Sequence, residues 1–263
     1  MRTALTIAGS DSGAGAGIQA DLKTFSAHGV YGTSAITAIT AQNTLALSDT
    51  VVLTPKIVTA QIKAVVEDFQ VDAIKIGMLS THQIVKTVAA IVAKLNIKNV
   101  VVDPVMLAKT GSRLLNDDAV VAVKENLLPY AAVVTPNAVE AAVLAGITVS
   151  SLESAREAAR RIHALGPATV VVKGGHLDTP KAIDLLYDGK EFTEFAGPRL
   201  TCANTHGTGC TFGAAIAANL ALGYPIQQSV ARAKEYVAQA IRHGLPLGRG
   251  HHIMWHKPTD EPV

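Results

Sequence analysis

The sequence predicts an α/β fold with a mostly parallel central sheet and helices on both of its faces. Short apolar runs alternate with longer segments of helical spacing along almost all of the 263 residues. Polar residues or glycines follow the apolar runs, as is typical of the carboxyl ends of parallel strands. Because no repeat and no linker-like segment divides the sequence, we expect residues 1–263 to form one domain.

The amino-terminal part begins with two strands separated by a turn and a helix. Arg2–Ala8 is an apolar run that predicts a buried strand, and the glycine-rich residues 9–17 predict a turn. Ile18–His28 has helical spacing and is followed by a glycine. Thr33–Gln42 alternates between apolar and polar residues, which predicts a half-buried strand, and Leu45–Leu53 predicts a shorter one.

Capping residues mark several of the later elements. Thr54 before Pro55 predicts a helix start, and Ser150 with Glu153 predicts a capping box for a helix that ends near Leu165. The other expected elements are, in order, a strand at Ala73–Gly77, a helix at Thr81–Leu95, a strand at Val100–Val102, a polar loop at Lys109–Asn116, a helix at Asp117–Leu128, a strand at Ala132–Thr135, a helix at Asn137–Ala145, a strand at Thr169–Lys173, a hairpin of Ala182–Tyr187 and Glu191–Phe195, a helix at Ile226–Arg242 and a polar tail at Thr259–Val263.

Composition excludes several classes of protein. Apolar residues make up 49% of the chain and the formal net charge is +2, so a large core is expected and a nucleic-acid groove is not. No apolar run is long enough for a membrane span, and the first residues lack the layout of a signal peptide. The two cysteines, Cys202 and Cys210, form neither a disulfide framework nor a zinc motif, which favours a reducing cytoplasm.

The segment Asn204–Leu222 is the most informative part of the sequence. Its polar first half leads into a long run of small apolar residues, which predicts a loop followed by a buried helix that starts near Gly207 or Thr208. Backbone N–H groups at a helix start, next to glycines such as Gly209, can bind an anion. Cys210 would lie in the first turn, where the same field should lower its thiol pKa. The alternative is a small buried hydrophobic residue.

The glycine-rich turn at residues 9–17 does not fit the common nucleotide-binding motifs. Gly13, Gly15 and Gly17 are spaced differently from the dinucleotide-binding pattern, and no lysine follows as in a P-loop. Asp11 would repel a phosphate. We therefore expect this turn, from Gly9 onward, to lie under a neutral ligand that forms hydrogen bonds.

Polar and unusual residues follow each of the predicted strands and should meet at one edge of the sheet. Each of these positions taken alone is a weak signal, because strand ends are often polar. Together with the anion-binding loop they predict one cleft. They are Asp11, Gln42, Asn43, Met78, Asp103, Asn137, Glu140 and Lys173.

The combination of an anion site, two acids and a lysine suits phosphoryl transfer. Asp103 and Glu140 offer the oxygen ligands that Mg²⁺ prefers. Lys173 can pair with nucleotide phosphates, although a solvated lysine at a strand end is nearly as common, and Asn137 lies on the same edge. Cys210, as a thiolate, could take the proton of an acceptor hydroxyl.

Five motifs in one order resemble the hydroxymethylpyrimidine/phosphomethylpyrimidine kinases of thiamine biosynthesis, which belong to the ribokinase-like superfamily. The resemblance covers nearly the whole chain. In the wider superfamily, the position of Cys210 usually carries an aspartate base. The motifs are the segments 9–23, Asp103–Met106, Thr135–Glu140, Val172–His176 and Asn204–Cys210.

The resemblance implies ATP with Mg²⁺ as the donor and 4-amino-5-hydroxymethyl-2-methylpyrimidine as the acceptor. It implies two steps, which form the monophosphate and then the diphosphate, and it suggests a homodimer. It places Gln42 on the pyrimidine and Asp21 near the acceptor, where we also expect Gly9, Asp11 and Met78. A carboxamide has a donor and an acceptor side by side, which matches an aminopyrimidine edge. An acid near a helix start, such as Asp21, needs no ligand to explain it.

Three other functions remain open at this stage. A pyridoxal kinase is the nearest, but those enzymes often carry a cysteine after the Asp-Pro-Val-Met motif, where this chain has Leu107, Ala108 and Lys109. A dinucleotide-dependent oxidoreductase is disfavoured by the glycine spacing. A ligand-binding regulator without catalysis would show no ATP turnover.

Overall fold

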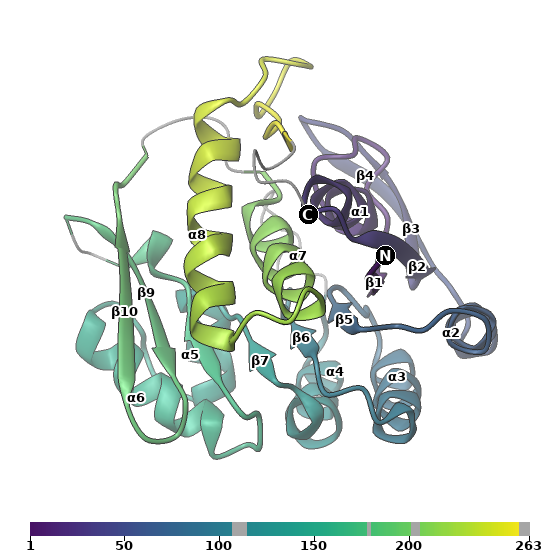
Figure 1. Cartoon of the computed structure of the whole chain (residues 1–263), viewed down its shortest axis with the longest axis horizontal. Helices are drawn as coiled ribbons and strands as arrows, with labels where there is room; N and C mark the ends of the chain where they lie inside the picture. Colours follow the sequence, from purple (N-terminus) through teal and green to yellow (C-terminus); the bar gives the residue numbers. More distant parts are fainter. Residues whose placement is uncertain (107–114, 178–179, 201–205, 258–263) are drawn as a thin grey trace.

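The computed structural model describes residues 1–106, 115–177, 180–200 and 206–257. Within this part of the chain, a sheet of eight strands has the order β10-β9-β8-β7-β6-β5-β1-β2. The six strands from β8 to β2 run parallel, and the hairpin of β9 and β10 adds two antiparallel strands at one edge (Figure 1). The predicted mostly parallel α/β sheet is therefore confirmed.

The strands lie close to their predicted positions. Those of the main sheet are β1 (Thr3–Ala8), β2 (Tyr31–Ile36), β5 (Ala73–Ile76), β6 (Val100–Val102), β7 (Val133–Val134), β8 (Val170–Val172), β9 (Ala182–Tyr187) and β10 (Phe192–Gly197). A separate two-stranded sheet consists of β3 (Ala38–Gln42) and β4 (Leu47–Val52).

The helices also follow the predicted alternation. Thr54 and Thr81 accept backbone hydrogen bonds as N-caps of α2 and α3, as their side chains allow. The helices are α1 (Gly17–Ala27), α2 (Pro55–Val66), α3 (His82–Leu95), α4 (Asp117–Ala122), α5 (Ala138–Ala145), α6 (Leu152–His163), α7 (Thr208–Ala221) and α8 (Ile226–Arg242).

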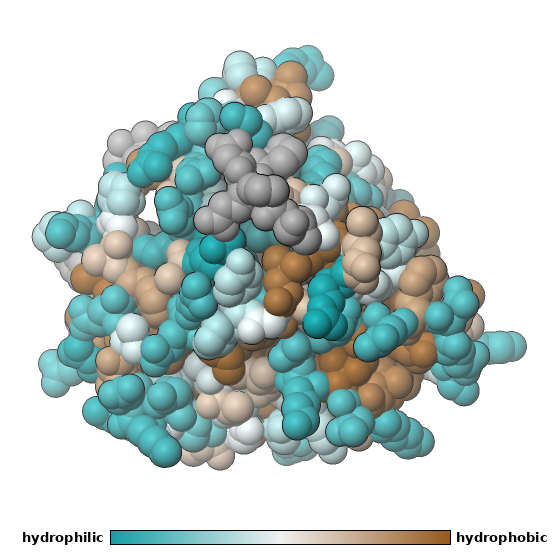
Figure 2. Space-filling view, in the orientation of Figure 1, coloured by the Kyte–Doolittle hydropathy of each residue, from teal (hydrophilic) through white to brown (hydrophobic). Residues whose placement is uncertain are grey.

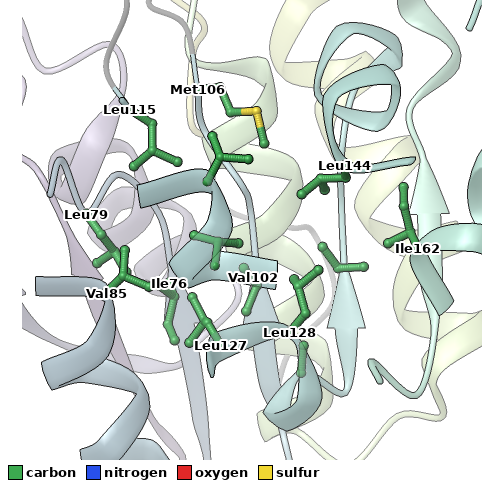
Figure 3. Close-up of a cluster of buried hydrophobic side chains, with 14 of the residues drawn as sticks. Ile76, Leu79, Val85, Val102, Met106, Leu115, Leu127, Leu128, Leu144 and Ile162 are labelled. Carbon is green, nitrogen blue, oxygen red and sulfur yellow. The ribbon is translucent and has the colours of Figure 1, made fainter. Parts of the chain in front are cut away.

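Helices cover both faces of the sheet and form two hydrophobic clusters. Successive residues of β6 divide between the clusters, because side chains alternate across a strand: Val100 and Val102 join one, and Val101 joins the other. The first cluster contains residues from α2 to α6, and Figure 3 shows its centre around Val102 and Leu128. The second contains α1, α7 and α8. Small residues along α7 are buried on all sides, so this helix can lie close to the sheet.

One predicted strand is in fact two. The segment Thr33–Gln42 breaks at Thr37. There the chain leaves the main sheet after β2 and enters β3, which pairs antiparallel with β4. The Thr37 N–H donates to Ala8 O, and its hydroxyl donates to Met78 O, so the break is fixed by buried hydrogen bonds. Burial alternates with period two within each strand, but its phase shifts at Thr37 and Ala38, which are both buried. A prediction of one continuous strand misses this shift.

Two further predictions need correction. The α-helix from Asp117 ends at Ala122 and continues as a π turn and a 3₁₀ turn up to Pro129 and Tyr130, since proline has no N–H for the helical ladder. The capping box of α6 uses Ser151 and Ser154, one residue later than expected, because Ser151 is the N-cap. The tail Thr259–Val263 and most of the predicted loop at Lys109–Asn116 lie outside the described residues.

No helix in the described part of the chain is long and apolar enough to span a bilayer. Figure 2 shows the face that carries α7 and α8 covered mostly by hydrophilic residues, with smaller hydrophobic areas between them.

Candidate active site

A cavity of about 1010 Å³ lies along the carboxyl ends of the parallel strands. It extends from the glycine-rich turn after β1 to the wall formed by β10 and α8. Asp21 and Asn43 do not line it, whereas the other residues predicted for the site do. They are Gly9, Asp11, Gln42, Met78, Asp103, Asn137, Glu140, Lys173, Gly207, Thr208, Gly209 and Cys210.

The amino terminus of α7 projects into this cavity. Gly207 is the N-cap, with a left-handed φ of 79°, and no side chain caps the helix. A Cβ at this position would lie 1.8 Å from Gly15 O, so only glycine allows the two loops to touch. The first backbone N–H groups of a helix have no partner within the helix, which makes this terminus suitable for a phosphate.

Cys210 lies between the starts of two helices. It is in the first turn of α7, and the backbone N–H of Gly17, the first residue of α1, donates to its sulfur. The residue is only half-buried, but the surrounding protein desolvates the thiol and raises its pKa to about 11, although Lys75 lowers it. The expected lowering of the thiol pKa is therefore wrong for the protein alone, because desolvation outweighs the helix field.

Asp11 holds the glycine-rich turn together. Its carboxylate accepts hydrogen bonds from the backbone N–H groups of Gly13, Gly15 and Ala16, and His206 Nε2 lies 3.0 Å from Oδ2. Burial would raise the pKa of Asp11, but the hydrogen bond from His206 and those from the backbone lower it. Both oxygens thus serve the loop, so the role of Asp11 at the cavity is to shape it.

Gln42 and Met78 lie on the side of the cavity next to this turn. Ser12 Oγ donates to Gln42 O and accepts from Gln42 N, which fixes the end of β3 to the turn. The carboxamide Oε1 lies 3.4 Å from Thr40 Oγ1. Met78 lies against Gly9, where a Cβ would come within 2.3 Å of Met78 Cε. This side therefore offers one carboxamide among small and apolar groups.

Two carboxylates share one lysine on the opposite side. Lys173 Nζ lies 2.7 Å from Asp103 Oδ1 and 3.9 Å from Glu140 Oε2. Burial lowers the pKa of Lys173, but Asp103 and then Glu140 raise it, with a net increase. Burial raises the pKa of Glu140 to about 7, which Lys173 opposes and Asp103 reinforces. Lys173 is therefore part of an ion pair and is not a solvated strand end.

Asn137 and Glu140 cap α5 as well as lining the cavity. Asn137 Oδ1 accepts from the N–H groups of Val139 and Glu140, and Glu140 Oε2 accepts from Asn137 N. One oxygen of Glu140 is thus occupied by the capping box. In the described residues no three His, Cys, Asp or Glu side chains cluster as metal ligands. Two carboxylates still fit Mg²⁺, which takes most of its other ligands from phosphates and water.

Asp21 does not border the cavity, which corrects its expected contact with the acceptor. It also lies beyond the first turn of α1, so a helix-dipole role does not explain it. Its Oδ2 accepts from Lys75 Nζ at 2.8 Å and from Thr6 Oγ1 at 2.6 Å, and all of this is buried. Lys75 does line the cavity. Sequence analysis missed Lys75, although a lysine inside the apolar run Ala73–Ile76 is an unusual feature that could have marked it.

The far wall was also missed by sequence reasoning. It includes Phe195 and Gly197 on β10 and Lys234 on α8. Lys234 Nζ lies 2.7 Å from Asp184 Oδ2, and Asp184 Oδ1 accepts from Gly174 N. The small residues of the hairpin and the amphipathic pattern of α8 resemble those of any surface element, so nothing in the sequence marked them.

A parallel sheet that carries a helix terminus, a lysine and two acids around one cavity defines a small-molecule kinase of the ribokinase-like class. The solved structures agree. The pyridoxal kinase of Bacillus subtilis, determined as an ADP complex, is 40% identical and superposes with a TM-score of 0.92 over 98% of both chains. A phosphomethylpyrimidine kinase from Clostridium difficile is 44% identical, with a TM-score of 0.82 over 92% of this chain and 100% of that one.

Sequence comparison identifies the family. The profile of the phosphomethylpyrimidine kinase family matches residues 11–255, and the chain belongs to that family. The hydroxymethylpyrimidine/phosphomethylpyrimidine kinase of Haemophilus influenzae is 48% identical over 95% of both chains. A thiamine biosynthesis bifunctional protein of Geobacter sulfurreducens is 51% identical over 98% of this chain, which spans only 53% of that protein.

Proposed function

We propose that this chain transfers phosphate from ATP to 4-amino-5-hydroxymethyl-2-methylpyrimidine and then phosphorylates the monophosphate to the diphosphate. The observation that carries the proposal is a single cavity with Gln42 on one side, the start of α7 in the middle and the cluster of Asp103, Glu140 and Lys173 on the other. Membership of the family and the names of its relatives support the same reaction.

Each side of the cavity has a task in this reaction. The Gln42 carboxamide pairs with the ring nitrogen and the amino group of the pyrimidine. The backbone N–H groups at the start of α7, around Gly209, bind the transferred phosphoryl group and stabilise its charge in the transition state. Lys173 leaves Asp103 in part to neutralise nucleotide phosphate. Asn137, at the adjacent helix start, contributes to the nucleotide side.

Asp103 and Glu140 would hold Mg²⁺, which would supply positive charge to balance that of the donor phosphates. Cys210 would act as the base for the acceptor hydroxyl in the first step. Because the thiol pKa is about 11 in the protein alone, only a small fraction is thiolate at neutral pH. The second acceptor is already an anionic phosphate and needs no base.

The wider setting follows the family resemblance. We propose a single kinase domain that works in the cytoplasm as a homodimer. The small sheet of β3 and β4 supports the dimer, because it exposes Ile39, Val51 and Val52. Light scattering tests the dimer independently of catalysis.

Product analysis tests the function itself. The purified protein is incubated with ATP, Mg²⁺ and the hydroxymethylpyrimidine, and products are followed by mass spectrometry. We expect the monophosphate first and the diphosphate later. Pyridoxal is offered in parallel, because pyridoxal kinases are among the most similar structures. Preferential phosphorylation of pyridoxal would replace the proposed acceptor, and no acceptor-dependent ATP turnover would reject the kinase.

A further inference from the structure

Lys75 is a charged residue in the middle of the fully buried strand β5. Neither Lys75 nor its partner Asp21 exposes any side-chain surface to solvent. A buried ion pair costs more to desolvate than it usually returns, and an apolar pair would often be as stable. In addition, Asp21 Oδ1 is buried and has no hydrogen-bond partner among the residues that the structure describes. The pair is therefore poorly explained as a contribution to folding.

The surrounding backbone makes room for this lysine. A Cβ on Gly77 would lie 2.9 Å from Lys75 Nζ, and a Cβ on Gly213 of α7 would lie 3.6 Å from Lys75 Cε. A side chain at position 77 would therefore crowd the ammonium group, whereas the Cβ at position 213 would only touch the lysine stem. The short distance to Gly213 places the lysine next to the first turns of α7, and the lysine also borders the cavity.

Four charged groups at this end of the cavity act electrostatically on Cys210. They are Lys75 on β5, Asp21 on α1, Asp103 after β6 and Lys173 after β8. Lys173 already pairs with Asp103. Asp21 Oδ2 accepts from Lys75 Nζ and also from Thr6 Oγ1, so the ammonium is held by a carboxylate that is itself fixed. Lys75 thus provides a positive charge at the end of the cavity near Cys210, and it is not the lysine that pairs with Asp103 and Glu140.

We propose that Lys75 is a positioning residue for the first phosphorylation: its ammonium, fixed by Asp21, stabilises the thiolate of Cys210. The thiolate takes the proton of the acceptor hydroxyl, the oxygen attacks the γ-phosphorus of ATP, and ADP leaves. Of the charged neighbours of Cys210, Lys75 has the largest effect on the thiol pKa and lowers it, whereas Asp21 raises it less strongly. This inference rests on the proposed function, which makes Cys210 the base.

The test measures the thiol directly, so it does not depend on kinase activity. In a Cys202→Ser background Cys210 is the remaining cysteine, and its alkylation by iodoacetamide is followed from about pH 7 to about pH 10. Asp21→Asn keeps the lysine and removes a negative charge, so alkylation should become faster. Asp21→Asn combined with Lys75→Met removes both charges, so alkylation should become slower than in the parent, by roughly tenfold for each unit of pKa increase.

Lys75→Arg keeps the charge and should alkylate at nearly the parent rate. A merely structural role would shift the Asp21→Asn variant and the double variant in the same direction, because both disturb the same packing. Such a result, or equal rates in all variants, would overturn the proposal. The double variant should also slow the first phosphorylation more than the second. If the opposite shifts in alkylation appear without any kinase activity, the electrostatic role stands and the proposed function fails instead.

Discussion

Lys173 Nζ lies 2.7 Å from Asp103 Oδ1, so the residue predicted to bind nucleotide and a residue predicted to bind metal neutralise each other across the cavity. Glu140 is the third member, with Oε2 3.9 Å from the same ammonium. Such a cluster can exchange partners when a phosphate and a cation enter together, because the net charge changes little.

Lys173→Met should therefore weaken both the site and the fold. We expect kcat/KM for ATP to fall about 10–100-fold, because a charge-assisted contact to phosphate is lost. Thermal stability at neutral pH should also fall, since Asp103 and Glu140 would repel each other in a buried place. Lys190→Met, in the exposed turn of the β9–β10 hairpin, is the control and should change neither quantity. Normal ATP kinetics in Lys173→Met would remove the lysine from nucleotide binding.

Glu140 should make stability depend on pH. Burial raises its pKa from 4.5 to about 7. Between these values the folded protein keeps a proton that the unfolded chain has released, so the free energy of unfolding should fall as pH rises through this window. Glu140→Gln retains a capping residue but does not titrate. We measure the free energy of unfolding by chemical denaturation from about pH 5 to about pH 7.5. Over this range the stability of Glu140→Gln relative to the parent should increase by about 1–3 kcal/mol. If the difference in free energy of unfolding between the variant and the parent stays constant over this pH range, Glu140 is ionised throughout it.

The contact between Gly207 and the glycine-rich turn should be essential. Gly207→Ala places a Cβ 1.8 Å from Gly15 O at a left-handed φ, so we expect the loss of at least about 3 kcal/mol of stability and of most activity. Gly223→Ala is the matched control just beyond the other end of α7. It has a φ of 94° and nothing within 4 Å, so it should cost only about 1–2 kcal/mol and leave activity intact. Equal effects of the two substitutions would contradict the role of the loop contact.

Gln42→Met should separate acceptor binding from donor binding. The side chains are similar in size, but methionine cannot pair with an aminopyrimidine edge. The KM for the pyrimidine should rise about 10–100-fold, while the KM for ATP stays near the parent value. Steady-state kinetics with each substrate varied in turn measures both. A parallel rise of both KM values would indicate a disturbed cavity in place of a lost hydrogen-bond pair.

The sequence predicted the layers of the fold, because apolar periodicity and capping residues such as Thr54 and Thr81 act locally. It also predicted that most of the candidate residues would gather around one cavity, since the carboxyl ends of parallel strands must meet. What it could not predict depends on contacts across the fold. The change of sheet at Thr37 depends on Ala8 and Met78, and the burial that raises the pKa of Cys210 depends on packing from several elements.

The same limit explains why the sequence misplaced Asp21 and left the role of Lys173 open. Asp21 was expected at the acceptor, but it is buried beneath Lys75, and only the tertiary pairing of α1 with β5 decides between the two positions. Lys173 was open between a phosphate ligand and a solvated strand end, and its ion pair with Asp103 excludes the second. The order of residues in the sequence does not predict which carboxylate forms an ion pair with a given lysine across the sheet.

The central claim is that Cys210 activates the acceptor hydroxyl beside the phosphate-binding start of α7. It is tested most directly by single-turnover rates of the two phosphorylations in Cys210→Ala. The account predicts that the first rate falls about 10²–10⁴-fold and that the second changes far less, because a phosphate acceptor needs no base. Equal losses in both steps would show that Cys210 only shapes the anion site, and an unchanged first rate would contradict the claim outright.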